Sequence, residues 1–425
     1  SYSEYAIRGG FFRVNYNYLD KYLLEVNGRY DGSSKFPKSS RFGFFPSVSA
    51  GWQIAQERFM NSTRHWLDGL KLRASYGVIG NQNINPYTFT PSMSVNNKAT
   101  SWIIDDTYVT SISSLPALVS QNFTWEKVGT INVGLDVNLF NNRLSGVFEW
   151  YQRNTNGMLA PGVQLPAVVG ASAPYQNTAD MRTRGWELSL NWRDQIGKVG
   201  YRIGFNLSDY KSEIIKYDDN AATKLLSSYY PGQTLGEIWG YVVDGYYTVD
   251  DFVDTSSWQL KEGVTSMNGY NVRPGDVKFK NLRDDDTSTN VITSGDNTFD
   301  NPGDRKVIGN TTPRYQYGIN LGMNYAGFDL NVILQGTGKR DYWISNVLTF
   351  PMNGDNFVPL FEGLSDYWMP KDPDNGDWSA VNPNAKYPRI YGNRGNSGSN
   401  LRQSDKYLSD ASYLRIKNIT LSYKL

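Results

Sequence analysis

Apolar and polar residues alternate strictly over several long stretches of this sequence. In residues 131–139, aliphatic side chains occupy every odd position, and polar residues or glycine occupy every even one. The same two-residue period runs through 186–193 and 315–325, where aromatic residues are frequent. Such a period predicts β-strands with one apolar and one polar face. These stretches exceed the roughly five or six residues usual in soluble sheets and suit tilted transmembrane strands of about 9–11 residues plus overhang.

The alternation predicts eleven long strands, joined by connections that are alternately short and long. The strands lie at about residues 5–18, 21–32, 41–55, 68–79, 126–140, 143–156, 181–194, 199–214, 311–325, 327–340 and 411–425. The long connections, rich in Gly, Asn, Asp, Ser and Pro, lie at about 33–40, 80–125, 157–180, 215–310 and 341–410. This asymmetry is typical of an outer-membrane β-barrel, which has short periplasmic turns and long extracellular loops.

The odd number of strands indicates that the barrel needs more chain to close. Bacterial single-chain barrels have an even number of strands, and an open sheet would leave two unpaired edges in lipid. The predicted fold class is all-β: a transmembrane antiparallel β-barrel in which residues 1–425 form the C-terminal half of a barrel of ~22 strands. Barrels of that size are normally plugged, so we expect a plug domain and an N-terminal half outside this sequence, upstream or in a separate chain.

Composition narrows the classes of function. The chain has 42 basic and 41 acidic residues, a net charge of +1, so no overall field attracts nucleic acid. Mean hydropathy is −0.52, and the absence of any apolar run of about 18 residues excludes a helical membrane span. Cysteine is absent, and the single histidine, His65, lies on a predicted periplasmic turn. We therefore expect neither an enzyme based on histidine or cysteine nor a His/Cys zinc site.

Five segments carry motifs in the order in which one known family has them. They are 71–83 (KLRASYGVIGNQN), 231–246 (PGQTLGEIWGYVVDGY), 275–280 (GDVKFK), 304–322 (DRKVIGNTTPRYQYGINLG) and 410–425 (DASYLRIKNITLSYKL). Together they resemble the SusC/RagA-like TonB-dependent outer-membrane transporters of Bacteroidetes. One departure is the last residue, Leu425, where outer-membrane barrels commonly end on an aromatic side chain.

The resemblance implies a location, a function and a set of partners. It implies a multi-pass β-barrel in the bacterial outer membrane that imports oligosaccharides or peptides and is not an enzyme. A SusD-like surface lipoprotein would act as a lid, and TonB–ExbB–ExbD would supply energy through the N-terminal plug region. The other partners would be the N-terminal barrel half and membrane lipid. Both kinds of cargo stay open, because sugar and peptide sites alike use aromatic and amide groups.

Aromatic side chains in the predicted loops are candidates for stacking on ligand or for contact with the lid. The candidates are Trp102, Tyr108, Tyr229, Tyr230, Trp239, Tyr241, Trp258, Trp343, Trp368 and Trp378. For each of them, packing inside the loops is the alternative role. We expect residues 215–310 to form much of the lid-docking surface.

Polar positions of the predicted strands should line the lumen. These are Arg13, Asn15, Arg73, Glu149, Glu187, Arg193 and Arg202. Charge in a polar lumen costs little, whereas a Lys or Arg on the lipid face costs about 2–4 kcal/mol at the bilayer midplane.

One acidic segment is a candidate Ca²⁺ site. Its carboxylates are Asp284, Asp286, Asp300 and Asp304. Carboxylate oxygens suit calcium, but the regular one-three-five spacing followed by a glycine at position six is absent. A solvated acidic loop is the alternative. No other cofactor is expected.

Two other functions remain open. A soluble, aromatic-rich carbohydrate-binding or hydrolytic β protein would show short strands and no asymmetry of loops. Paired carboxylates for glycoside hydrolysis are available by composition, although no motif places two of them together. A plugless porin would share the barrel and differ only in the upstream sequence.

Overall fold

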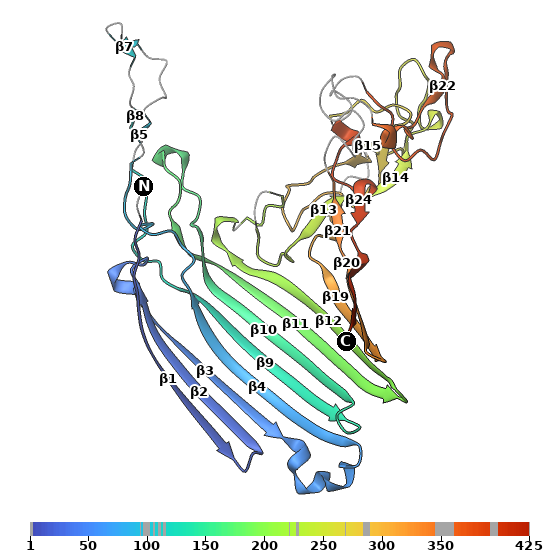
Figure 1. Cartoon of the computed structure of the whole chain (residues 1–425). Helices are drawn as coiled ribbons and strands as arrows, with labels where there is room; N and C mark the ends of the chain where they lie inside the picture. Colours follow the sequence, from blue (N-terminus) through green and yellow to red (C-terminus); the bar gives the residue numbers. More distant parts are fainter. Residues whose placement is uncertain are drawn as a thin grey trace.

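An eleven-stranded antiparallel sheet forms the body of the molecule (Figure 1). The computed structural model describes residues 3–93, 95–96, 103–104, 107–108, 112–113, 116–220, 222–226, 229–267, 269–283, 290–344, 361–391 and 398–424. The strands follow one another in chain order, so each connection joins two neighbours. Over these residues, no helix is both long and apolar enough to cross a membrane.

The long strands agree with the predicted ones to within a few residues, except for two neighbouring strands that are longer. In sheet order they are β1 (Ile7–Tyr18), β2 (Tyr22–Ser33), β3 (Phe42–Gln53), β4 (Leu67–Asn81), β9 (Glu126–Leu139), β10 (Leu144–Pro161), β11 (Tyr175–Ile196), β12 (Val199–Tyr217), β19 (Arg314–Tyr325), β20 (Phe328–Lys339) and β25 (Tyr413–Tyr423).

The predicted bounds of the loop 157–180 are wrong, because β10 and β11 extend into it. Only residues 162–174 form the connection. Gly157, a turn-type residue in the sequence, has φ = 65° and lies at a β-bulge between the two strands. A bulge accommodates an extra residue without ending the pairing.

Tight turns lie at one end of the sheet, which we call the short-turn end; the opposite end is the long-loop end. Leu19 and Asp20 both have φ = 54°, and Asn141 and Asn142 have φ = 57° and 58°. Positive φ at both central residues is the signature of a type I′ turn, whose twist matches that of paired strands. The connection between β3 and β4 is longer and holds two 3-10 helices, η2 (Ile54–Gln56) and η3 (Arg58–Thr63).

The sheet has an apolar outer face and a polar inner face. Strand register places Leu72, Leu135 and Phe148 side by side on the outer face, and it places Arg73 and Glu149 on the inner face, on either side of β9. Leu135 and Phe148 are 38% and 44% exposed. A whole face of exposed apolar side chains suits contact with lipid. The soluble alternative is therefore wrong.

Aromatic residues at the short-turn end show how the strands tilt. Tyr18 and Tyr22 end the outer apolar face on β1 and β2, and Tyr325 and Phe328 end it on β19 and β20. When the register is followed from strand to strand, the row of paired residues that starts at Tyr18 on β1 reaches Tyr317 on β19. The eight residues from Tyr317 to Tyr325 span ~27 Å, and the eight strand spacings from β1 to β19 span ~38 Å. The ratio of these two distances is the tangent of the strand tilt, which is therefore about 35°, as in transmembrane barrels.

The two outermost strands have open edges. Among the described residues, β1 pairs only with β2, and β25 pairs only with β20. Open backbone groups cannot be satisfied in lipid, because no water is available there. A membrane barrel therefore requires further strands beside both edges.

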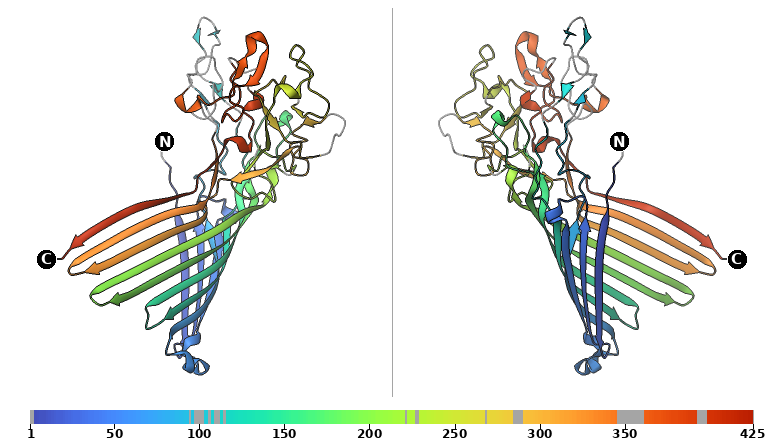
Figure 2. Two further views of the ribbon diagram at one scale, coloured as in Figure 1. Left: turned by 90° about the vertical axis from the view of Figure 1, so that its right-hand side faces the viewer. Right: turned by 90° about the vertical axis from the view of Figure 1, so that its left-hand side faces the viewer.

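Small two-stranded sheets build the long loops, which gather at one end of the sheet (Figure 2). The pairs are β5 (Val95–Asn96) with β8 (Ile112–Ser113), β6 (Ile103–Ile104) with β7 (Thr107–Tyr108), β13 (Glu237–Tyr241) with β18 (Arg305–Asn310), β14 (Val243–Tyr246) with β16 (Val277–Phe279), β15 (Ser266–Met267) with β17 (Val291–Ile292), β21 (Asp341–Trp343) with β24 (Leu408–Asp410), and β22 (Pro370–Asp372) with β23 (Asp377–Ala380). We call the described parts of the two longest connections, 218–313 and 340–412, the cap.

Candidate functional site

The inner face of the sheet is a polar wall. All seven predicted lumen-lining residues lie on it: Arg13, Asn15, Arg73, Glu149, Glu187, Arg193 and Arg202. Their contact with cargo or with a plug stays a prediction.

Arg73 links three strands of this wall. Its guanidinium donates to the carboxylate of Asp136 at 2.8 and 2.9 Å, and to that of Glu149 at 2.6 Å. The Nδ2 of Asn132 also donates to Glu149, at 3.2 Å. Glu187 lies directly opposite Glu149 and makes no hydrogen bond or ion pair with any described residue. Its carboxylate is therefore free to bind a cationic group inside the lumen.

Four hollows along the inner face of the described residues have volumes of about 940, 490, 450 and 390 Å³. The largest borders Arg13 and Trp125, the next borders Arg73, and the two smallest both border Arg193 and Arg202. Amides, hydroxyls and arginines occur in the linings, and the largest hollow adds many aromatic and aliphatic side chains. Such linings suit a ligand that combines hydrogen-bonding groups with some apolar surface.

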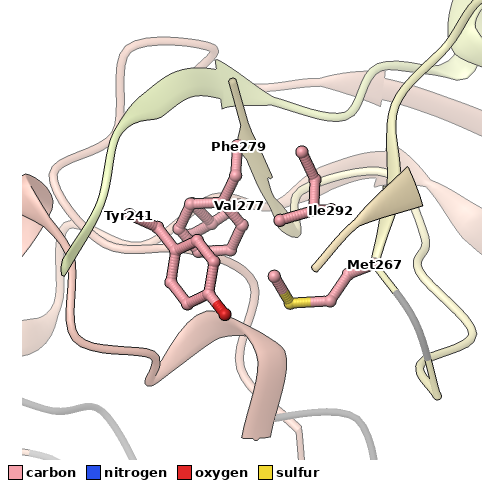
Figure 3. Packing of buried hydrophobic residues seen from close by; sticks show 5 residues of the cluster. All are labelled: Tyr241, Met267, Val277, Phe279 and Ile292. Carbon is pink, nitrogen blue, oxygen red and sulfur yellow. The ribbon is translucent and has the colours of Figure 1, made fainter. Parts of the chain in front are cut away.

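The cap is one packed body that uses both of its loops. Its largest buried cluster comes from four short strands of the first loop (Figure 3) and consists of Tyr241, Met267, Val277, Phe279 and Ile292. The second loop closes over this cluster. There the backbone N–H of Tyr241 donates to the carbonyl of Gln403 at 2.9 Å, and the hydroxyl of Ser399 donates to the sulfur of Met267 at 3.3 Å.

A buried carboxylate, Asp276, joins the two loops of the cap. Asp276 is 1% exposed and accepts hydrogen bonds from Asn400 Nδ2 at 2.9 Å, the Tyr391 hydroxyl at 2.6 Å and the Arg273 backbone N–H at 2.8 Å. Burial raises the pKa of Asp276, although these donors favour its charged form. Sequence reasoning missed this network, because Asn400 lies 124 residues away and no motif links the two.

Three of the predicted ligand-binding aromatics are part of the buried interior of the cap. Tyr230, Trp239 and Tyr241 are 1%, 8% and 5% exposed. The indole N–H of Trp239 donates to the Tyr230 hydroxyl at 2.9 Å and to Glu237 at 2.8 Å, and the Tyr230 hydroxyl donates to Glu237. Burial, together with the neighbouring Glu237 carboxylate, raises the pKa of Tyr230. These side chains stabilise the cap.

Trp258 and Trp378 connect the two loops of the cap. Their rings meet edge to face with centroids 5.0 Å apart. Arg273 lies over Trp258 at 5.5 Å, and Arg389 lies over Trp378 at 4.9 Å. Edge-to-face contacts and cation–π contacts both fix the positions of rings, so this group adds rigidity to the cap.

Trp368 and Trp343 are also packed within the cap. Trp368 is 2% exposed and lies against Gly275, where a side-chain Cβ would come within 2.3 Å of the ring. Trp343 packs on the cluster around Leu364, Tyr387 and Tyr407.

Tyr229 has the most exposed ring among the candidate aromatics whose side chains the structure describes. It is 48% exposed, and its ring meets that of Tyr217 at 5.6 Å. Trp102 lies outside the described residues, and so does the side chain of Tyr108 in β7. For all ten candidate aromatics, contact with ligand or lid stays a prediction.

In the acidic segment near residue 300, the carboxylate of Asp304 accepts hydrogen bonds from backbone N–H groups. Asp304 is 1% exposed and accepts the backbone N–H groups of Leu282 at 2.8 Å and Thr293 at 2.7 Å. Asp300 is exposed, and Asp284 and Asp286 lie outside the described residues. Within the described part of the chain, no three His, Cys, Asp or Glu side chains are placed to hold a metal ion. A Ca²⁺ site stays a prediction.

A second loop core lies above β3 and β4, and sequence reasoning missed it. Phe36, Phe45, Phe123 and Trp125 are all less than 7% exposed and pack together. The indole N–H of Trp125 donates to the carbonyl of Arg41 at 2.9 Å, which ties residues 82–125 to residues 34–41. The only signal in the sequence is the aromatic pair just before β9.

Long tilted strands, an apolar outer face, a polar inner wall and a loop cap together define an outer-membrane β-barrel of the receptor and transporter class. The chain belongs to the TonB dependent receptor-like, beta-barrel family, whose family model matches residues 1–425. This family is not one of enzymes.

Individual relatives agree with this family. The chain is 29% identical to TonB-dependent receptor P3 of Formosa agariphila, over 98% of this chain and 38% of that protein. It is 28% identical to TonB-dependent receptor SusC of Bacteroides thetaiotaomicron, over 97% of this chain and 37% of that protein. The RagAB peptide importer in its open-open state has the same fold, with a TM-score of 0.74 and 24% identity over 99% of this chain and 40% of that one. The chain thus spans about two fifths of the length of these relatives.

Proposed function

We propose that this chain provides part of the wall and the extracellular cap of a TonB-dependent importer of oligosaccharides or peptides. In this proposal a SusD-like lipoprotein closes over the cap as a lid, and an N-terminal half of the barrel pairs with the open edges of β1 and β25. TonB–ExbB–ExbD drives transport through a plug. The similarity to SusC and to the RagAB peptide importer supports the proposal.

The observation that carries the proposal is the packed cap at the long-loop end of a polar wall. A cap with its own buried core and an inter-loop carboxylate network offers a firm surface on which a lid can close. The hollows along the wall also expose amides, hydroxyls and arginines, which suit the hydroxyl and amide groups of sugars and peptides.

The proposed cycle has three steps. Cargo is captured between lid and cap, it is shielded from bulk solvent as the lid closes, and it passes along the inner wall when the plug moves. The carboxylate of Glu187, which has no partner among the described residues and lies beside the Arg73 cluster, is available to a cationic residue of the plug. Most of the predicted aromatic residues have a supporting role in this cycle, because they form the interior of the cap.

Lid docking can be tested with substitutions on the exposed surface of the cap. Val253 and Val381 are 58% and 56% exposed and lie in the segments that carry Trp258 and Trp378. In the full-length protein, Val253→Glu with Val381→Glu should reduce the amount of lipoprotein that co-purifies, because two buried charges would enter the docking surface. Ile196→Glu is the matched control, since Ile196 is 70% exposed at the short-turn end. Equal recovery of the lipoprotein from all three proteins would contradict lid docking at this part of the cap.

Energy coupling distinguishes the importer from a plugless porin. Uptake of a fluorescently labelled glycan or peptide mixture by intact cells should stop when TonB is deleted, while the protein remains in the outer membrane. A porin would continue to pass the label. Uptake that is independent of TonB would therefore overturn the proposal in favour of passive diffusion.

A further inference from the structure

Three cations lie together on the outer face of β11 and β12, near the long-loop end. They are Arg182, Arg184 and Lys211, and we call them the rim patch. Strand register places Arg184 directly opposite Lys211. Arg184 lies two positions before Trp186 on β11, on the same face and nearer the long loops. Because residues two apart on a strand share a face, all three cations point away from the lumen.

The rim patch lies at the upper boundary of the lipid-facing surface. Trp150 lies directly opposite Trp186 on the outer face and is 40% exposed, as expected of an aromatic girdle. Arg184 and Lys211 follow this girdle by two residues, or about 7 Å, toward the long loops. Tyr76 on β4 and Ile131 on β9 belong to the same row of paired residues as Arg184, and both side chains suit contact with lipid. Because the strands are tilted, this row rises toward the long-loop end from β4 to β12. The row therefore leaves the hydrocarbon layer and reaches the level of the headgroups.

The charges of the rim patch have little compensation within the protein. No member makes an ion pair among the described residues, and Glu213, opposite Arg182, is the one nearby carboxylate without a partner. The next carboxylate on this face, Asp209, is already paired with Arg314. Like charges directly opposite each other on a sheet destabilise it unless an anion lies between them.

The geometry also prepares Arg184 for an anion. Its Nε donates to Gln152 Oε1 at 2.8 Å, which orients the guanidinium and leaves its two terminal amino groups available. Arg182 Nε is buried and has no hydrogen-bond partner. An arginine fork with a facing lysine, about 5 Å away at Cβ, fits the oxygens of one phosphate group.

We propose that the rim patch binds a phosphate group on the headgroup of an outer-leaflet lipid. A lipid is the expected ligand, because the patch continues directly from the lipid-facing girdle and its charge complements phosphate. The bound lipid would fix the β11–β12 wall beneath the cap. This inference does not depend on the cargo or on the lid.

Native mass spectrometry of the full-length protein in detergent micelles can test the site. Diphosphoryl lipid A is the probe, and its fully dephosphorylated form shows whether phosphate is recognised. Arg184→Gln with Lys211→Gln should lower the apparent affinity for the diphosphoryl lipid roughly tenfold or more, the effect of losing charge-assisted hydrogen bonds. Binding of the dephosphorylated lipid should stay unchanged. Arg153→Gln is the control, because Arg153 lies on β10 at a similar height but on the inner face.

Two outcomes would overturn the proposal. In the first, the double variant binds the diphosphoryl lipid as the wild type does, or Arg153→Gln weakens it equally. In the second, inorganic phosphate at 50 mM displaces the lipid, which would make the site one for free anions. A mobility shift on boiling, present in every variant, confirms that each barrel is folded before its lipids are counted.

Discussion

Neighbouring residues of the long strands lie in different solvents. Leu135 is on the apolar outer face between Leu72 and Phe148, whereas Asp136 accepts hydrogen bonds from Arg73 on the inner wall. The burial of an individual side chain therefore says little here about its role. The face on which it lies decides whether lipid or water surrounds it.

Leu135→Arg should impair assembly of the barrel. A cation on the lipid face near the midplane costs about 2–4 kcal/mol, and Leu135 lies well inside the outer apolar face. The measurement is the fraction of protein that folds into vesicles. Asn138→Arg serves as the control, because Asn138 lies on the inner wall beside the smallest hollow. If Asn138→Arg were the more harmful change, the assignment of the two faces would be wrong.

Tyr230→Phe should loosen the cap. Removing the hydroxyl leaves Trp239 with one hydrogen-bond acceptor fewer and Glu237 with one donor fewer, at a cost of about 1–3 kcal/mol in local stability. Hydrogen exchange of residues 222–245 should become faster by the corresponding factor. Tyr229→Phe, at the adjacent exposed ring, should change it little. Equal effects of the two changes would show that the hydroxyl of Tyr230 is not a structural contact.

The same pair of tyrosines shows that the sequence does not predict which side chains of a loop are buried. Tyr229 and Tyr230 are adjacent and chemically identical, yet one is 48% exposed and the other 1%. In a long strand, two adjacent residues lie on opposite faces, so the two-residue period would have predicted which one is buried. In an irregular loop no period exists, so the seven lumen-facing residues could be placed on their face from sequence and the buried aromatics could not.

At the scale of elements, strands differ in how far sequence determines them. The eleven long strands repeat their alternation often enough to be recognised, and they pair with their neighbours in the chain. The strands of the cap are two to six residues long, and β13 pairs with β18 some sixty residues later. Such pairings depend on tertiary packing, so neither composition nor periodicity predicts them.

Gly275→Ala should separate the two loops of the cap. Gly275 has φ = 89°, and a Cβ there would lie 2.3 Å from the Trp368 ring, so left-handed strain and overpacking of about 1–3 kcal/mol act together. Limited proteolysis should then cut within residues 361–391 sooner. Gly263→Ala is the matched control, because Gly263 has φ = 80° and nothing within 4 Å of an added Cβ. If both variants were cleaved equally fast, backbone strain rather than the tryptophan contact would explain the effect.

At the scale of the whole molecule, two edges that are unpaired among the described residues bound the sheet. Hydrogen bonding along β1 and β25 must be completed inside the membrane, because no solvent can do so there. The strand count and the register follow from the sequence pattern. The position of the cap does not, because it depends on contacts such as that between Asp276 and Asn400.

The full-length protein should behave as a closed barrel on gels. Extracted in detergent and left unboiled, it should migrate faster than after boiling, because a closed barrel keeps its hydrogen bonds in sodium dodecyl sulfate. The Leu135→Arg variant should show a smaller fraction of the fast-moving form. Identical mobility before and after boiling would rule out closure of the sheet.

The shared core of the cap has an evolutionary consequence. The first loop supplies Asp276 and Gly275, and the second supplies Asn400 and Trp368, with two complete wall strands between them in the chain. A recombination event that exchanged only one loop between relatives would join halves of two unrelated interiors. Descendants should therefore inherit both loops as a pair, and a change of lid or cargo would arise from exchanging the pair over a conserved wall.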